Sequence, residues 1–236
     1  MKPSHQLLYV LLTLLWGSAL ASALPGRAQV MQMVGKAVLI NAVGNSSSLA
    51  VGMVLGSGDT VSTGPGSTVD LWLGLNGDWL RVDSESTLKF DLLDIANISE
   101  RRVTTSMSLT RGSVTGNVNT KLTAASKYEL RTEAGVAEVR GTVYAFKSNG
   151  TLVVTKGVVN FTFVLKGVTT TVRVESGQQF TPGDAVPTPA SQTLLDQVTQ
   201  AAIQLSEDIG TIRVGNLTVT VTPTTENPLA VSASGK

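Results

Sequence analysis

Cysteine is absent from the chain, and this absence narrows the chemistry that the protein can perform. Without thiols there are no disulfide bonds, no thiolate nucleophile and no cysteine-ligated metal. The single histidine, His5, falls in an N-terminal segment that we expect to be removed. The mature chain would then lack histidine as well, which excludes Ser-His-Asp catalysis and the common zinc sites. No Asp-x-Asp-x-Asp-Gly loop indicates a calcium site either, so we expect neither a metal nor another cofactor.

Charged residues are also scarce, and the two signs nearly balance. They make up 15% of the chain, with 18 Lys and Arg against 17 Asp and Glu. A nucleic-acid-binding surface needs a basic stripe, so no nucleic acid is expected as a partner. Hydrophobic residues account for 42% of the sequence, which is typical of a globular protein with a sizeable core.

The N-terminus has the layout of a secretory signal peptide over residues 1–23. Lys2 precedes a short apolar run, Leu7–Leu20, and Ala21 and Ala23 provide small residues for cleavage. This run is shorter than the roughly 20 residues that span a bilayer, and polar residues interrupt every later apolar run. We therefore expect a periplasmic or secreted protein with no stable membrane span after cleavage. Retention of the segment as a membrane anchor is the alternative.

Alternation of apolar and polar residues predicts β-strands through most of the remaining chain. In VDLWLGL (69–75) every second residue is Val or Leu, and Asn76-Gly77 follows as a hairpin signal. Segment 93–105, which holds Glu100-Arg101-Arg102, fits the alternation poorly and is predicted to be a long solvated loop. The predicted core positions are Leu71, Leu73, Leu80, Leu88, Phe90, Leu109, Val139, Phe146 and Val174.

Glycines recur where one predicted strand gives way to the next. Examples are LTRGSV (109–114), VTKGVV (154–159) and VESGQQF (174–180). Such strand–Gly–strand units indicate hairpins or the corners of a coil of short strands. The predicted fold class is therefore all-β, either a solenoid-like β-roll or a two-sheet β-sandwich of short strands.

The C-terminal part breaks from this pattern. Residues 182–190 are rich in proline and read as a linker. Apolar residues at i, i+3 and i+4 spacing predict one amphipathic helix over 191–209, ended by Gly210. Residues 211–236 are expected to form a short hairpin and a mobile tail.

Short motifs in a fixed order connect this chain to a known family. They are Gly58-Asp59-Thr60-Val61, Thr63-Gly64, Leu71–Leu75 with Asn76-Gly77, Leu80-Arg81-Val82, Ser86-Thr87-Leu88, Leu109 with Gly112 and Val114, Val139-Arg140-Gly141-Thr142, and Gly177-Gln178. In this order and spacing, residues 30–181 resemble the FecR-like domain of bacterial envelope proteins. Two departures are Glu133, where the family often has Pro, and Asn76, where it often has Asp.

The resemblance implies a non-catalytic, β-rich extracytoplasmic domain that binds another envelope protein or a wall component. Together with the glycine corners, it favours the roll over the sandwich. The family's iron-citrate regulator carries a cytoplasmic anti-sigma segment, and we expect none here because six residues precede the apolar run. A signal-anchored envelope sensor related to iron-citrate signalling is one alternative.

A glycan-acting enzyme that works through two carboxylates is the other alternative. Its candidate acids are ordinarily solvated in turns and on outer strand faces, which argues against this reading. They are Asp59, Asp70, Asp78, Asp83 and Glu85. The identity of the partner and the oligomeric state are left open by the sequence.

The stretch EVRGTVYAF (138–146) holds the candidate site, Arg140, Gly141 and Thr142. Glycine inside a strand pattern indicates a bulge or a turn, and arginine offers five donors to carbonyls or a carboxylate. A structural corner is favoured over a binding role, although both readings stay open. Strict alternation would place Val139 and Val143 on one face, and Arg140, Thr142 and Tyr144 on the other.

Overall fold

A computed structural model describes residues 24–100, 102–118, 122–207, 212–214, 217–221 and 231–234. The expected signal peptide and most of the C-terminal tail lie outside these residues. Within the described chain, no helix has the length and apolar character needed to cross a membrane.

Twenty strands and one helix follow one another along the described chain. The first nine strands are β1 (Leu24–Pro25), β2 (Ala28–Val34), β3 (Ala37–Ile40), β4 (Ser46–Ser48), β5 (Val54–Leu55), β6 (Thr60–Thr63), β7 (Thr68–Gly74), β8 (Asp78–Val82) and β9 (Thr87–Asn97). The next eight are β10 (Arg102–Arg111), β11 (Ser113–Asn117), β12 (Lys127–Thr132), β13 (Gly135–Lys147), β14 (Leu152–Leu165), β15 (Val168–Glu175), β16 (Gln178–Phe180) and β17 (Thr188–Pro189). The helix α1 (Gln192–Glu207) precedes a separate small sheet of β18 (Ile212–Val214), β19 (Leu217–Val221) and β20 (Val231–Ser234).

Strand pairing divides the main sheet into two arms that diverge from the β13–β14 hairpin. The β12 arm runs β12–β10–β9–β6–β3–β4, with β1 also paired to β9. The β11 arm runs β11–β8–β7–β2–β5. Strand β13 serves both arms because its first residues pair with β12 and its last residues pair with β11. All of these pairings are antiparallel except β10–β12, which is parallel.

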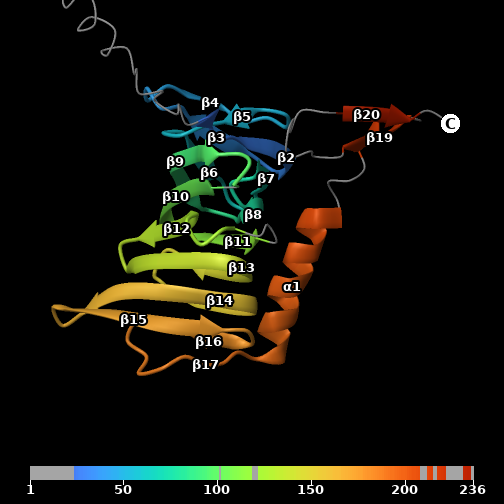
Figure 1. Ribbon diagram of the computed structural model, residues 1–236. Coiled ribbons are helices and arrows are strands. Elements are labelled where there is room, and N and C mark those ends of the chain that lie inside the picture. Colours follow the sequence, from blue (N-terminus) through green and yellow to red (C-terminus); the bar gives the residue numbers. More distant parts are fainter. Residues whose placement is uncertain are drawn as a thin grey trace, which may run out of the picture.

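Strands β2 to β5 gather at one end of the molecule, β6 to β12 lie in its middle, and β13 to β17 follow one another to the other end (Figure 1). The sheet is curled, and α1 lies along one side of the stack. The prediction of an all-β fold of short strands with one C-terminal helix is confirmed.

The hydrophobic core lies between the two arms and continues beneath the β13–β14 hairpin. All nine side chains predicted for the core are buried, each at most 1% exposed. A cluster of phenylalanines, Phe146, Phe161, Phe163 and Phe180, fills the end near β16 with ring centroids 5.5–6.1 Å apart. Alternation along each strand was therefore sufficient to assign these inward faces.

The prediction of a long loop over residues 93–105 is wrong. Strand β9 continues to Asn97, and β10 begins at Arg102 and pairs back along it. Buried polar contacts support this hairpin, since the Asn76 amide nitrogen lies 3.1 Å from the Thr104 carbonyl and 3.2 Å from the Thr105 hydroxyl. The Thr105 hydroxyl is buried and bonded to Asn76, so a polar side chain occupies an inward-facing position of this hairpin. For this reason the segment lacks the apolar pattern of a buried strand.

Helix α1 covers the outer face of the β11 arm and of the adjoining hairpin. It contacts β8, β11, β13 and β14, and buries Val198, Ala202 and Leu205. The outward-facing side chains there are themselves buried, as Val153 on β14 and Thr115 on β11 illustrate. The outer face of the β12 arm carries no such helix among the described residues.

Candidate functional site

Residues Arg140, Gly141 and Thr142 form the corner at which β13 passes from one arm to the other. Gly141 has φ +60°, and the pairing with β14 shifts register between Arg140 and Val143. Gly157 on β14 has φ +85°, and a Cβ there would lie 2.5 Å from the Gly141 carbonyl oxygen. The two strands thus bend together, with two residues of β13 opposite one of β14, which is the arrangement of a β-bulge.

A buried hydroxyl satisfies the carbonyls that the corner frees from the ladder. The Thr142 Oγ1 lies 3.0 Å from the Arg140 carbonyl oxygen and 3.1 Å from that of Val158. Thr142 is fully buried, whereas Arg140 and Gly141 are exposed. Thr142 therefore has a structural position, and Arg140 alone of the three presents its side chain to the surface.

The predicted faces of this stretch are wrong beyond the corner. Tyr144 is fully buried together with Val139, whereas Val143 is only partly buried. The bulge adds a residue to one strand, so every side chain after it changes face relative to simple alternation. The buried Tyr144 hydroxyl lies 3.1 Å from that of Tyr128, and burial raises the pKa of both phenols.

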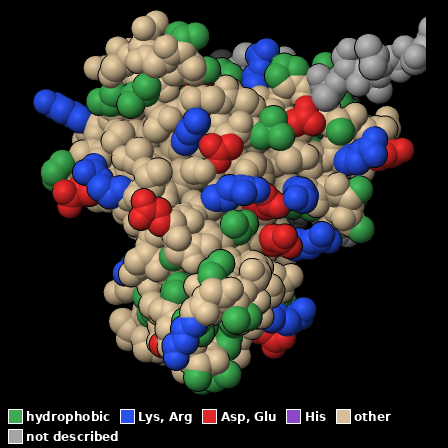
Figure 2. Space-filling view, turned by 90° about the vertical axis from the view of Figure 1, so that its left-hand side faces the viewer, with side chains coloured by type: hydrophobic (Ala, Val, Ile, Leu, Met, Phe, Trp, Pro, Cys, Tyr) green, Lys and Arg blue, Asp and Glu red, His purple; other side chains and the backbone are tan. Residues whose placement is uncertain are grey.

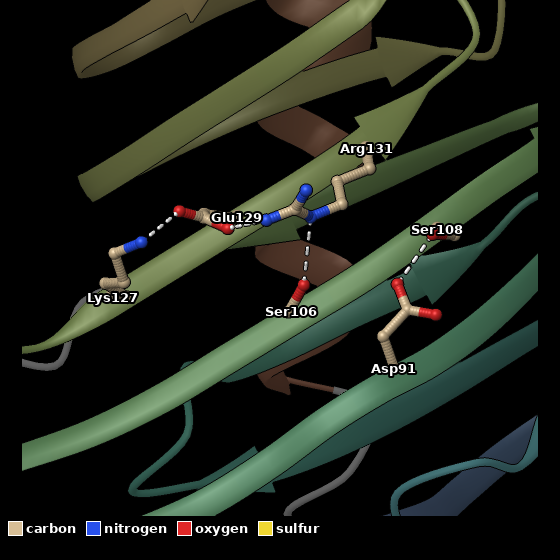
Figure 3. A network of polar contacts seen from close by, with 6 residues as sticks. All are labelled: Asp91, Ser106, Ser108, Lys127, Glu129 and Arg131. Atoms are coloured by element: carbon tan, nitrogen blue, oxygen red, sulfur yellow. Dashed lines mark hydrogen bonds and ion pairs between the residues drawn. The ribbon is translucent and has the colours of Figure 1, made fainter.

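A network of charged and hydroxyl side chains lies on the outer face of the β12 arm, and we call it the polar ladder (Figure 3). It consists of Asp91 on β9, Ser106 and Ser108 on β10, and Lys127, Glu129 and Arg131 on β12. Lys127 Nζ and Arg131 Nη2 donate to the two oxygens of Glu129 at 2.8 and 2.6 Å. Arg131 Nε also donates to Ser106 Oγ at 3.2 Å, and Ser108 Oγ donates to Asp91 at 2.6 Å.

The carboxylate of Glu129 stays ionised in this setting. Burial by itself would raise the pKa of Glu129, but hydrogen bonds from Lys127 and Arg131, and the charges of both, outweigh it and lower the pKa. The hydrogen bond to Glu129 in turn raises the pKa of Lys127. A carboxyl group with a lowered pKa is a poor proton donor, so the polar ladder is suited to holding charges in place rather than to acid catalysis.

A small depression adjoins the polar ladder and brings it together with Arg140. Its volume is about 50 Å³. It is lined by Ser126, Lys127, Tyr128, Glu129, Glu138, Val139 and Arg140. Small-molecule sites ordinarily measure about 300–1,000 Å³, so this depression fits a single polar group of a larger partner.

The charges around the depression are unevenly paired. Glu138 on β13 stands directly opposite Glu129 on β12, and like charges opposed across a strand pair repel. Lys127 and Arg131 compensate Glu129, whereas no hydrogen bond or ion pair to a described residue engages the Arg140 guanidinium. Arg140 is therefore the cation of this group that no described carboxylate engages, and it is available to bind another molecule.

Three of the five carboxylates that the sequence suggests for an enzyme form contacts within the fold. Asp70 forms a bidentate pair with Arg81 at 2.6 and 2.7 Å, and Asp59 accepts the backbone N–H groups of Ala42 and Gly56. Burial raises the pKa of Asp83, which accepts a hydrogen bond from Ser113. Among the described residues, no group of three His, Cys, Asp or Glu side chains is placed to hold a metal ion.

Arg140 is a site residue that the sequence predicts, whereas the polar ladder is not predicted from the sequence. The alternating charges of Lys127, Glu129 and Arg131 are visible in the sequence, and they indicate one solvated strand face. What the sequence does not reveal is the parallel pairing of β12 with β10, which places Ser106 opposite Glu129 and within hydrogen-bond distance of Arg131.

Comparison with known proteins identifies the central part of the chain. Residues 59–160, from the turn before β6 into β14, match the family model described as FecR protein. The chain therefore contains a FecR domain, and the corner, the polar ladder and the depression all fall within it. No curated protein matches the chain.

Two crystal structures of a "putative anti-sigma factor" from Parabacteroides distasonis ATCC 8503 are similar to the chain, each with a TM-score of 0.46. The sequence identities are 12% and 14%, over 66% of this chain and 67% and 68% of those chains. Similarity of this degree establishes no shared function.

Proposed function

We propose that this protein is a non-catalytic extracytoplasmic binding module whose FecR domain engages another protein or a wall component of the cell envelope. The observation that carries the proposal is the outer face of the β12 arm, which no described helix covers. There the polar ladder and the uncompensated Arg140 surround a depression that accepts one polar group. Figure 2 looks onto this side of the molecule and displays a band of mixed basic and acidic side chains across its middle.

The face is preorganised for recognition because strands, not loops, hold its charges. Glu129 is 8% exposed and fixed by two donors, so the positions of Lys127 and Arg131 are defined before a partner arrives. Holding side chains in their bound geometry lowers the entropic cost of association. The Arg140 guanidinium can then receive a carboxylate of the partner in bidentate geometry.

The proposed location outside the cytoplasm rests on the signal-peptide layout of residues 1–23. N-terminal sequencing of the protein from fractionated cells tests it. A mature N-terminus near Ala21 or Ala23 in the soluble envelope fraction is expected. An intact Met1 in the membrane fraction would instead favour the signal-anchored sensor.

Affinity purification from the protein's own envelope tests the binding role. The wild-type chain should bind a partner that Arg140→Ala binds about tenfold more weakly or worse, since hydrogen bonds to a charged group are worth about 1.5–3 kcal/mol. The matched control is Arg111→Ala, which removes an exposed arginine at the end of β10. Equal recovery by Arg140→Ala and Arg111→Ala would contradict a role for this face.

A carboxylate-based glycosidase is the weaker candidate. Such an enzyme needs a cleft for a sugar ring flanked by two carboxyl groups. The depression described here is about 50 Å³, and the best-buried acids, Asp70 and Glu129, are each held by cationic partners.

A further inference from the structure

Strand β15 is an exposed sheet edge that differs from the other edges of the fold. It pairs with β14 along its whole length, and with no other described strand. The other strands that end the main sheet are β1, β4, β5 and β17, which are two or three residues long. Short edges are one way in which proteins avoid pairing with other chains, and β15 has eight residues.

The remaining protective devices are also missing from β15. Its sequence, VTTTVRVE, contains no proline or glycine, and its eight pairs with β14 run without a register shift. Arg173 and Glu175 form an ion pair with each other at 2.9 Å, so the two charges of the strand largely cancel. Val and Thr have high strand propensity, and the edge therefore presents a regular template for one more strand.

The tip of the β14–β15 hairpin adds apolar surface beside this edge. Val164, Leu165 and Val168 are 68%, 43% and 64% exposed. The hairpin projects from the stack in Figure 1, and apolar side chains are prominent on the lower lobe in Figure 2. A partner that pairs with β15 would also cover part of this surface.

We infer that β15 is a self-association edge, at which two copies of this chain pair antiparallel through a two-fold axis at Thr171. The argument for a second copy is the self-complementarity of the strand in that register. On the core side, Val168 meets Val174 of the partner subunit and Thr170 meets Val172 of the partner subunit. On the outer side, Arg173 meets Thr169 of the partner subunit, so no like charges are directly opposed. This interaction is separate from the binding proposed for the polar ladder.

Site-directed cross-linking tests the inferred register. Residues directly opposite in an antiparallel pair have Cα atoms about 4.5–5.5 Å apart, a separation that a disulfide can bridge. The chain has no cysteine of its own, so Thr171→Cys introduces a single thiol that would face its own copy. The matched control is Ser47→Cys, an exposed position on the short edge strand β4. Under mild oxidation Thr171→Cys should form a covalent dimer about tenfold faster or more, because pairing raises the local thiol concentration.

A charge exchange at the same position provides a second test that leaves the fold intact. Thr171 is exposed, and both Thr171→Glu and Thr171→Lys place like charges opposite each other across the two-fold axis. Each variant alone should dimerise several-fold more weakly than the wild type in sedimentation velocity. An equimolar mixture of the two should recover association, because opposite charges then face each other.

Three results would overturn the inference. They are a wild-type chain that stays monomeric at every concentration, cross-linking of Thr171→Cys no faster than Ser47→Cys, and a Glu–Lys mixture no more associated than either variant. None of these results bears on the Arg140 purification, so the two proposals fail independently.

Discussion

The outer face of the sheet differs in polarity between the two ends of the β13–β14 hairpin, one beside the β11 arm and one beside the β12 arm. On the β11 arm, the outward side chains of β13 and β14 are small or apolar, as at Ala145 and Val153, and α1 covers them. On the β12 arm, the same two strands turn Glu138 and Asn160 outward, and no described element covers them. At these positions the apolar outward side chains lie under another element of the chain, whereas the polar ones face solvent or a partner.

The ion pairs of the two arms differ in how far their side chains are exposed to solvent. The Arg81 and Asp70 side chains on the β11 arm are 15% and 3% exposed. On the β12 arm, the Glu129 side chain is 8% exposed, but those of Lys127 and Arg131 are 62% and 49% exposed. The first pair is enclosed by the fold, while the second keeps its cations available to another molecule.

The largest expected effect comes from the core that both arms share. Leu73→Ala should lower the free energy of unfolding by about 2–5 kcal/mol, because it removes a fully buried side chain and leaves a cavity. The control, Leu92→Ala, changes a leucine that is 43% exposed and should cost well under about 1 kcal/mol. Urea unfolding measures both, and an unchanged midpoint for Leu73→Ala would show that the inward face of β7 is misassigned.

The corner that separates the two faces should be the next most sensitive. Gly157→Ala should destabilise by about 1–3 kcal/mol, since the new Cβ meets the Gly141 carbonyl and the residue keeps a positive φ. Gly141→Ala has open space around its Cβ and should cost about 1 kcal/mol from φ alone. Thermal unfolding of the two variants should rank them in this order, and the reverse order would contradict the bulge.

Weakening the contact between α1 and the outer face of the β11 arm should lower the free energy of unfolding of the protein. Val198→Ala removes a buried side chain from the helix and should cost about 1–2 kcal/mol. Ile203→Ala on the same helix, at a residue 37% exposed, should cost less. Equal effects on the denaturant midpoint would mean that the helix does not dock through the Val198 face.

A substitution on the outer face of the β12 arm, which no described helix covers, should affect stability least and should affect binding more than stability. Arg140→Ala should change the free energy of unfolding less than Gly141→Ala, because the guanidinium is exposed. Calorimetric unfolding alongside the affinity purification compares the two properties. If Arg140→Ala unfolded more readily than Gly141→Ala, the arginine would be part of the corner rather than of a binding surface.

The carboxyl groups of Glu129 and Asp83 should contribute to the stability of the fold with opposite dependence on pH. Glu129 has a lowered pKa in the fold, so its stabilisation is present above the unfolded-state pKa and is lost as pH falls through the folded value. Asp83 has a raised pKa, so the stability it contributes is present below the unfolded-state pKa and is lost as pH rises through the folded value. Unfolding of Glu129→Gln and Asp83→Asn between about pH 3 and 7 should change the slope in opposite directions relative to the wild type.

The inward faces and the helix could be predicted from the sequence because each depends on a local period. Leu71 and Leu73 alternate with their neighbours, and Val198, Ala202 and Leu205 recur at helical spacing. The glycine at 141 was also correctly read as a place where the strand bends. These features need no knowledge of which strands become neighbours.

The other structural features depend on which strands become neighbours, and the sequence does not show this. The change of face after Gly141 follows from its opposition to Gly157, and the polar ladder follows from the parallel pairing of β12 with β10. The hairpin over 93–105 was missed because its stabilising contacts are polar and run to Asn76. Long-range pairing, rather than residue type, decided each of these outcomes.

The position of β13 also sets the order in which the fold can be completed. No strand pairing in the described chain joins the two arms directly, and β13, which begins at Gly135, is the strand that pairs with both. During synthesis from the N-terminus, strands β1 to β12 emerge before the strand that pairs with both arms. Until β13 is synthesised, β11 and β12 each lack the neighbour that β13 supplies, so each arm has an unpaired strand edge. The nascent protein therefore passes through a stage that is open to misassembly, and chaperone protection would matter most over that interval.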